Sequence, residues 1–137
     1  MSDLKITILG CGSSFGVPLF HNIWGKCDPK EPKNKRTRPS ILVQKNNKNL
    51  LIDTSPDLKQ QFLSNKIDNI DTVFYTHEHA DHTHGINELR SINLIQGKII
   101  PCYGNEQTME KITNSFNYLF ENTEKSYYPA ILSKNHF

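Results

Sequence analysis

A strand that runs directly into a cluster of histidines is the feature that most constrains this chain. Residues 71–76, DTVFYT, are dominated by β-branched and aromatic side chains, which predicts a buried strand. The next nine residues, HEHADHTHG, hold four histidines, one glutamate and one aspartate. The cluster is therefore expected at the C-terminal end of a strand, where open α/β sheets usually keep their functional residues.

The remaining hydrophobic patterns predict an α/β fold in one domain, residues 1–137. Period-two or short apolar runs predict further strands, and apolar residues at helical spacing predict helices. The tail from Glu121 has no clear period. The order of elements predicts a mixed sheet flanked by helices. The expected strands are 4–10, 40–45, 49–53 and 98–104, and the expected helices are 56–66, 85–95 and 105–120.

The histidine cluster has the side chains of a metal site. Neutral imidazole and carboxylate are the usual nitrogen and oxygen ligands of zinc, with manganese as an alternative ion. His77 and His79 are two residues apart and can grip one ion together, whereas the adjacent Asp81 and His82 can turn toward a second. Two ions would share a hydroxide as nucleophile, and Asp81 could receive a proton. A solvated surface loop is the other interpretation, and the buried strand before it argues against that.

Charge is modest overall but uneven along the chain. The formal net charge is +2, which does not predict a nucleic-acid partner. Residues 19–39 are expected to form one long basic loop, and residues 26–38 alone carry six lysines and arginines. Arg36 and Arg38 are weak candidates for binding the phosphates of a substrate. A merely solvated basic loop is the alternative.

Cysteine usage and hydropathy indicate a cytoplasmic location. The three cysteines are widely spaced and form no CxxC pair, which predicts neither a disulfide framework nor a zinc ribbon. No stretch approaches the roughly 20 apolar residues of a membrane span, and the first residues do not have the pattern of a signal peptide. No membrane partner is expected.

The segment THEHADHTHG matches the HxHxDHxxG signature, so the chain resembles the metallo-β-lactamase fold hydrolases. The segments GCGSSFGVP, LLIDTSPDL and HADHTHGINELR resemble the bacterial subgroup related to phosphoribosyl cyclic phosphodiesterase and, more distantly, the tRNA 3′-end processing endonuclease. The resemblance implies that His77 and His79 ligate a first metal and that Asp81 and His82 ligate a second. It also implies that Asp53 orients residues 77–85, which are called the metal loop below. It also implies two zinc ions, a metal-bound hydroxide and a small phosphodiester substrate.

The resemblance further implies an αββα sandwich built from two similar halves, of which this chain is expected to be the N-terminal half. The family's second half supplies a third histidine, a bridging aspartate and a last histidine. No aspartate follows Asp81, and the histidines that remain after His82 are His84 and His136. His84 is expected to be a spectator, and His136 is expected on a frayed terminus. The ligand set is therefore expected to be incomplete.

Three functional hypotheses follow. The first is a metal-dependent, phosphodiesterase-like hydrolase that is inactive as a truncated chain until a second chain supplies the missing half. The second is a catalytically dead remnant, or a half-domain that requires a second chain. The third is a relative of tRNA-processing nucleases. Whether the isolated chain is an enzyme is left open by the sequence, and a dimer that rebuilds the site is the least easy solution because it still lacks the bridging carboxylate.

Overall fold

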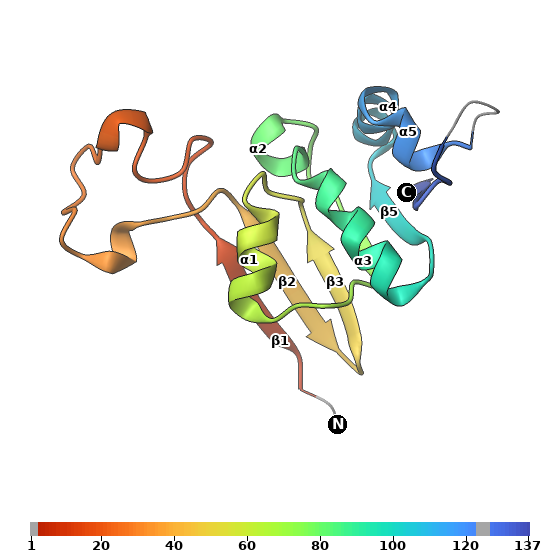
Figure 1. The fold of residues 1–137 in the computed structure, drawn as a ribbon, viewed down its shortest axis with the longest axis horizontal. Helices are drawn as coiled ribbons and strands as arrows, with labels where there is room; N and C mark the ends of the chain where they lie inside the picture. The colour runs from red at the N-terminus through yellow and green to blue at the C-terminus, as the bar shows by residue number, and fades with distance from the viewer. Residues whose placement is uncertain (1–2, 123–126) are drawn as a thin grey trace.

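The chain folds into one six-stranded mixed sheet with helices, as seen in a computed structural model that describes residues 3–122 and 127–137 (Figure 1). The strands follow chain order across the sheet, β1-β2-β3-β4-β5-β6. The pairs β1/β2 and β2/β3 are antiparallel, and the later pairs are parallel. The predicted α/β class and mixed sheet are confirmed. The strand bounds are β1 Lys5–Gly10, β2 Ser40–Lys45, β3 Lys48–Ile52, β4 Thr72–Phe74, β5 Ile100–Gly104 and β6 Leu132–His136.

The period-two pattern of the strands creates one buried face. Leu51, Val73 and Cys102 are neighbours across β3, β4 and β5, and all are fully buried. Side chains at alternate positions in a strand point to opposite faces, so these three lie on the same side of the sheet. The core therefore lies between this face and the helices.

The helices supply the apolar stripes that cover this face. The α-helices are α1 Leu58–Asn65, α2 Ala80–Thr83, α3 Leu89–Gln96, α4 Glu106–Ser115 and α5 Asn117–Phe120, with short 3₁₀ helices η1 Phe20–Asn22, η2 Pro32–Asn34 and η3 Ile86–Glu88. Buried side chains of α1, α3 and α4 join the sheet in one core cluster. Asn105 caps α4 by accepting a hydrogen bond from the amide of Thr108 at 2.8 Å. Figure 1 shows α1 and α3 on the same side of the sheet.

The opposite face of the sheet is left open. Ile6 and Ile8 on β1 have 60% and 65% of their surface exposed, although both are β-branched strand residues. Ile41, Val43 and Phe74 on this face are only half-buried. An apolar sheet face of this extent is usually covered by another layer of protein.

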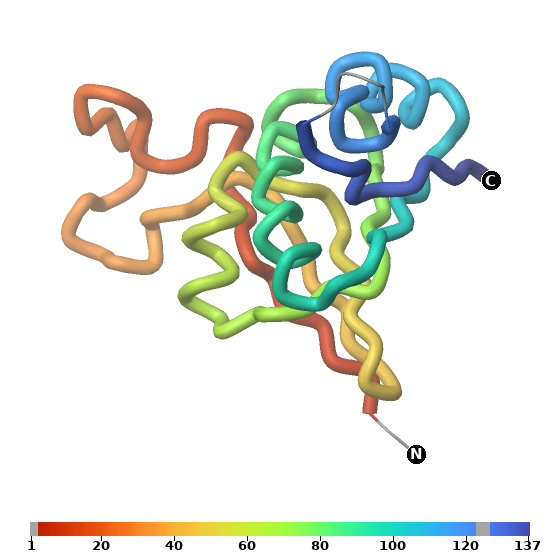
Figure 2. The backbone as a smooth tube through the Cα atoms, turned by 45° about the vertical axis from the view of Figure 1, so that its right-hand side comes forward, coloured from red at the N-terminus to blue at the C-terminus, as the bar shows by residue number. Residues whose placement is uncertain are grey.

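Residues 11–39 form an arm that projects from the sheet (Figures 1 and 2). This segment contains no strand or α-helix, only two 3₁₀ turns. Its two ends are held together at the sheet, because Val17 and Arg36 exchange backbone hydrogen bonds at 2.9 and 3.0 Å and the amide of Gly12 donates to the carbonyl of Thr37 at 2.7 Å.

Three expectations from the sequence need correction. The helix expected over 105–120 is interrupted at Phe116, whose φ of −128° leaves the helical region. The tail, for which no element was expected, includes a strand, because residues 132–136 form β6 and pair in parallel with β5. His136 therefore lies opposite Gly104 in the sheet rather than on a frayed end. Among the described residues, no helix has the length and apolar character needed to cross a membrane.

Candidate metal centre

The histidine cluster lies at the C-terminal edge of β3 and β4, as the sequence predicted. Two backbone hydrogen bonds hold the loop that carries it to the chain after β3. The amide of Thr54 donates to the carbonyl of His82 at 2.8 Å, and the amide of Gly85 donates to the carbonyl of Thr54 at 2.9 Å. The approach is so close at Gly85 that an added Cβ would lie 1.8 Å from the carbonyl oxygen of Ser55. Glycine is therefore required where the loop leaves the cluster.

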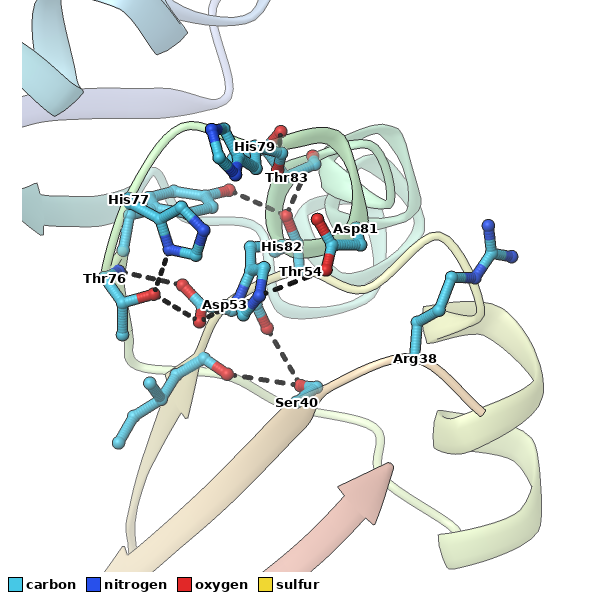
Figure 3. Close-up of polar contacts among 12 residues, drawn as sticks. Arg38, Ser40, Asp53, Thr54, Thr76, His77, His79, Asp81, His82 and Thr83 are labelled. Atoms are coloured by element: carbon cyan, nitrogen blue, oxygen red, sulfur yellow. Dashed lines mark hydrogen bonds and ion pairs between the residues drawn. The ribbon is translucent and has the colours of Figure 1, made fainter. Parts of the chain in front are cut away.

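A single turn of helix arranges the second half of the motif. Helix α2 begins after His79, whose extended backbone (φ −60°, ψ 151°) makes it the N-cap residue. The hydroxyl of Thr83 donates to the carbonyl of His79 at 2.9 Å and closes the turn. The turn brings the ring of His82 beside that of His77 and places Asp81 next to His82 (Figure 3). The sequence did not predict this helix, because four residues are too few to show a helical period.

Asp53 is the buried centre of the site. Only 4% of its surface is exposed, and its φ of 60° lies in the left-handed region, which costs a non-glycine residue on the order of 1 kcal/mol. Its Oδ1 accepts from the amide of Thr76 at 2.8 Å, and its Oδ2 lies 2.7 Å from both the Thr76 hydroxyl and Nδ1 of His82. The hydroxyl of Ser40 donates to its carbonyl at 2.8 Å. The predicted orienting residue therefore contacts the metal loop directly.

The four predicted ligands converge from these elements (Figure 3). The ring centre of His77 lies 4.1 Å from that of His82 and 4.7 Å from that of His79. Because Nδ1 of His82 faces Asp53, its Nε2 faces outward and lies 3.3 Å from Oδ2 of Asp81. Two atoms bound to one tetrahedral zinc at 2.0–2.2 Å lie about 3.3–3.6 Å apart, so this pair fits a shared ion.

The donors fit a metal in type but occur in pairs rather than as a closed set. Within residues 3–122 and 127–137, no group of three or more histidine, cysteine, aspartate or glutamate side chains is arranged to hold an ion. A catalytic zinc takes about three protein ligands and leaves one position open. The nitrogen and carboxylate donors present are therefore suited to zinc, and each ion would need further ligands.

Glu78 and His84 point to other partners. The carboxylate of Glu78 pairs with Nζ of Lys111 on α4 at 2.5 Å, and this ammonium group lowers the pKa of Glu78. The ring of His84 meets the ring of Phe116 edge-on, with centres 5.6 Å apart. The contact of Glu78 ties the metal loop to α4, and the ring of His84 packs against Phe116.

The two arginines proposed for phosphate binding have partners of their own. Arg38 donates to both carboxylate oxygens of Asp57, at 2.9 Å from Nε and 2.6 Å from Nη2, and the guanidinium lowers the pKa of Asp57. In Figure 3 its side chain lies apart from the histidines. Arg36 is exposed and donates to Sγ of Cys11 at 3.0 Å. Within the described residues, the side-chain hydrogen bonds of the two arginines go to Cys11 and Asp57 rather than to the cluster, so their role in substrate binding stays a prediction.

Sequence reasoning missed the hydroxyl groups that support the cluster. Thr76, Ser40 and Thr54 each make a hydrogen bond that fixes Asp53 or the metal loop. The position of Thr76, directly before His77 at the end of the predicted strand, was the only available signal. Ser40 and Thr54 had none, because their roles depend on contacts between distant segments.

Comparison with known sequences gives a consistent family assignment. The family model described as "Beta-lactamase superfamily domain" matches residues 48–134. The chain is 35% identical over 128 residues to an octanoyltransferase of Porphyromonas gingivalis and 27% identical over 118 residues to a ribonuclease Z of Methanococcus maripaludis. These matches cover 93% and 83% of this chain but only 25% and 32% of the two relatives. The chain thus spans a quarter to a third of their length.

Comparison with solved structures identifies the same fold. A diphosphatase of the PhnP family superposes with a TM-score of 0.80 at 34% identity, over 98% of this chain and 51% of that one. Zinc-bound PqqB of Methylobacterium extorquens gives 0.68 at 20% identity, and the short form of human tRNase Z gives 0.63 at 18%. The matches cover 96% and 99% of this chain and 45% and 44% of those chains.

Proposed function

The chain belongs to the beta-lactamase superfamily, with the metallo-β-lactamase fold, and on that premise we propose that it is the N-terminal half of a divalent-metal phosphodiesterase. The observation that carries the proposal is the spacing of 3.3 Å between the outward donor atoms of Asp81 and His82, which suits two ligands of one ion. The relatives named diphosphatase and ribonuclease Z also support chemistry at phosphate groups.

In this proposal His77 and His79 hold one ion, and Asp81 and His82 hold the other. Zinc is the preferred ion and manganese the alternative. When bound, two such ions supply Lewis acidity and an activated water for attack on a phosphodiester. In this proposal Asp53 keeps the His82 ring turned outward, with its Oδ2 at 2.7 Å from Nδ1 of that ring. The carboxylate of Asp81 would receive a proton during the reaction.

The remaining ligands are assigned to a second layer of protein on the open sheet face. The exposed Ile6 and Ile8 support this assignment, because an uncovered apolar face favours packing against another layer. The diphosphatase chain is about twice the length that this chain matches. The second layer would lie in a longer form of this polypeptide or in a second chain. A small phosphodiester remains the proposed substrate, since a net charge of +2 does not favour a long nucleic acid.

The first test is zinc binding by the chain itself. Titration calorimetry should show zinc binding to the wild-type chain and much weaker binding to His79→Ala. His79 is exposed and makes no hydrogen bond through its side chain within the described residues, so its loss should leave the fold intact. His136→Ala, at the end of β6, is the matched control and should bind zinc like the wild type. Equal binding by His79→Ala would contradict the ligand assignment.

The second test supplies the missing half. In a chimera, residues 1–137 replace the matching half of the PhnP-family diphosphatase, which shares 34% identity with them. The chimera should hydrolyse bis(p-nitrophenyl) phosphate, and the same chimera with His79→Ala should not. A folded, zinc-loaded chimera without activity on the diester would contradict the proposal.

A further inference from the structure

The hydroxyl of Thr76 lies between the buried carboxylate of Asp53 and the ring of His77. Its Oγ1 is 2.7 Å from Oδ2 of Asp53 and 3.0 Å from Nδ1 of His77. The same Oδ2 lies 2.7 Å from Nδ1 of His82. One carboxylate oxygen therefore contacts His82 directly and His77 through a single hydroxyl (Figure 3).

The positions of the protons follow from this arrangement. An ionised carboxylate only accepts hydrogen bonds, so the Thr76 hydroxyl donates its one proton to Asp53. The hydroxyl can then only accept from His77, which requires a proton on Nδ1 of that ring. Nδ1 of His82 must likewise carry a proton to donate to the carboxylate. In the neutral ring, Nε2 of His77 is then left as a free lone pair, whereas Nε2 of His82 lies 3.3 Å from Oδ2 of Asp81.

We propose that Thr76 is a positioning residue whose hydroxyl, held by Asp53, fixes the tautomer of His77. The carboxylate of Asp53 then determines the tautomers of both rings, that of His82 by direct contact and that of His77 through Thr76. The link to metal binding rests on the proposed function, because it assigns His77 to one ion and His82 to the other. The tautomers themselves do not depend on it, since they belong to the chain without metal.

Asp53 and Thr76 therefore support different numbers of rings. Loss of the Asp53 carboxylate removes the acceptor for His82 and also the acceptor that orients the Thr76 hydroxyl toward His77. Loss of the Thr76 hydroxyl removes the support of His77 alone and leaves the contact of 2.7 Å between Asp53 and His82 in place. Thr76 is exposed, whereas Asp53 is buried, so a valine of similar shape at position 76 should be tolerated by the fold.

The test reads the ring tautomers by ¹⁵N NMR in the metal-free chain. Spectra are recorded at a pH at which the ¹⁵N chemical shifts themselves show that both rings are neutral. The wild type should show the Nδ1–H form at both His77 and His82. Thr76→Val should convert only His77 to a mixture dominated by the Nε2–H form, and Thr76→Ser should restore the wild-type spectrum. Thr72→Val, at the start of β4, is the matched control and should change neither ring.

Zinc titration of the same variants provides the second readout. Thr76→Val should weaken zinc binding by about 10–100-fold, the range seen when a hydrogen-bond partner of a ligand histidine is lost, and Thr76→Ser should remain within a few-fold of wild type. An Nε2–H tautomer at His77 in the wild type, or an unchanged His77 spectrum in Thr76→Val, would overturn the inference. Correct tautomers in a chain that binds no zinc would instead refute the proposed function and leave the positioning role of Thr76 intact.

Discussion

Gly85→Ala should destabilise the chain strongly, because the backbone after the metal loop passes too close to the chain after β3. The added Cβ would meet the carbonyl oxygen of Ser55 at 1.8 Å and its carbonyl carbon at 2.7 Å. Both are backbone atoms, which cannot rotate away as a side chain can. The φ of Gly85 is −86°, outside the left-handed region that favours glycine, so the effect is assigned to this contact.

The magnitude follows from the two interactions that must yield. Overpacking in a close-packed interior costs about 1–3 kcal/mol, and sometimes more. Moving the loop also weakens the hydrogen bond of 2.9 Å from Gly85 to Thr54, worth about 1 kcal/mol. The free energy of unfolding should therefore fall by about 3 kcal/mol. With a urea m-value of about 2 kcal/mol/M, the unfolding midpoint should fall by about 1.5 M.

The assay is urea unfolding followed by far-UV circular dichroism, with Gly97→Ala as the matched control. Gly97 has a φ of 66° and open space around the added Cβ, so alanine there meets backbone strain of about 1 kcal/mol without a collision. Gly85→Ala should therefore lower the midpoint about three times as far as the control. An equal or smaller effect of Gly85→Ala would refute the close approach of these two loops.

Two further substitutions and one measurement of thiol reactivity test other parts of the structure. Asp53→Asn should weaken zinc binding by about 10–100-fold in calorimetry, because it removes the charged acceptor of the His82 Nδ1 proton. Asp57→Asn should flatten the acid limb of the stability curve: Arg38 lowers the pKa of Asp57, so the pair stabilises the fold fully above the ordinary value of 3.8 and loses this contribution as the pH falls through the lower folded pKa. Burial raises the pKa of the Cys102 thiol, so it should react with an aromatic disulfide reagent only after unfolding, while the other two thiols react in the native chain.

Each of these has an outcome that counts against the structure. Wild-type zinc affinity in Asp53→Asn would show that the carboxylate does not orient the ring. An unchanged acid limb in Asp57→Asn, measured by denaturant unfolding at several pH values, would mean that the ion pair with Arg38 contributes nothing to stability. Rapid reaction of all three thiols in the native state would place Cys102 outside the core.

The sequence predicted the parts of the fold whose signal is local. The apolar alternation of β1 to β3 and the run before His77 identified the strands, and helix α3 began within a few residues of the expected position. β6 was missed because Leu132 is the one apolar residue of this strand, and because its pairing with β5 is a contact between distant segments. Such a contact leaves no period in a segment of five residues.

The site shows the same division. The spacing of His77, His79, Asp81 and His82 indicated a metal cluster, because these residues are adjacent in the chain. The hydroxyl of Thr76 could not be assigned a role from sequence, since its position between Asp53 and His77 depends on how β3 and β4 pair. The open face of the sheet was expected from the resemblance to one half of a sandwich, and Ile6 and Ile8 lie exposed on it.

The zinc stoichiometry and affinity of the purified chain test the central claim most directly. Calorimetric titration of the wild type should show binding of at least one zinc ion per chain, and a combined His77→Ala, His79→Ala and His82→Ala variant should bind none. Circular dichroism should show that this variant remains folded. A folded wild-type chain that binds no zinc, or zinc binding that survives loss of all three histidines, would contradict the assignment of this cluster as a metal centre.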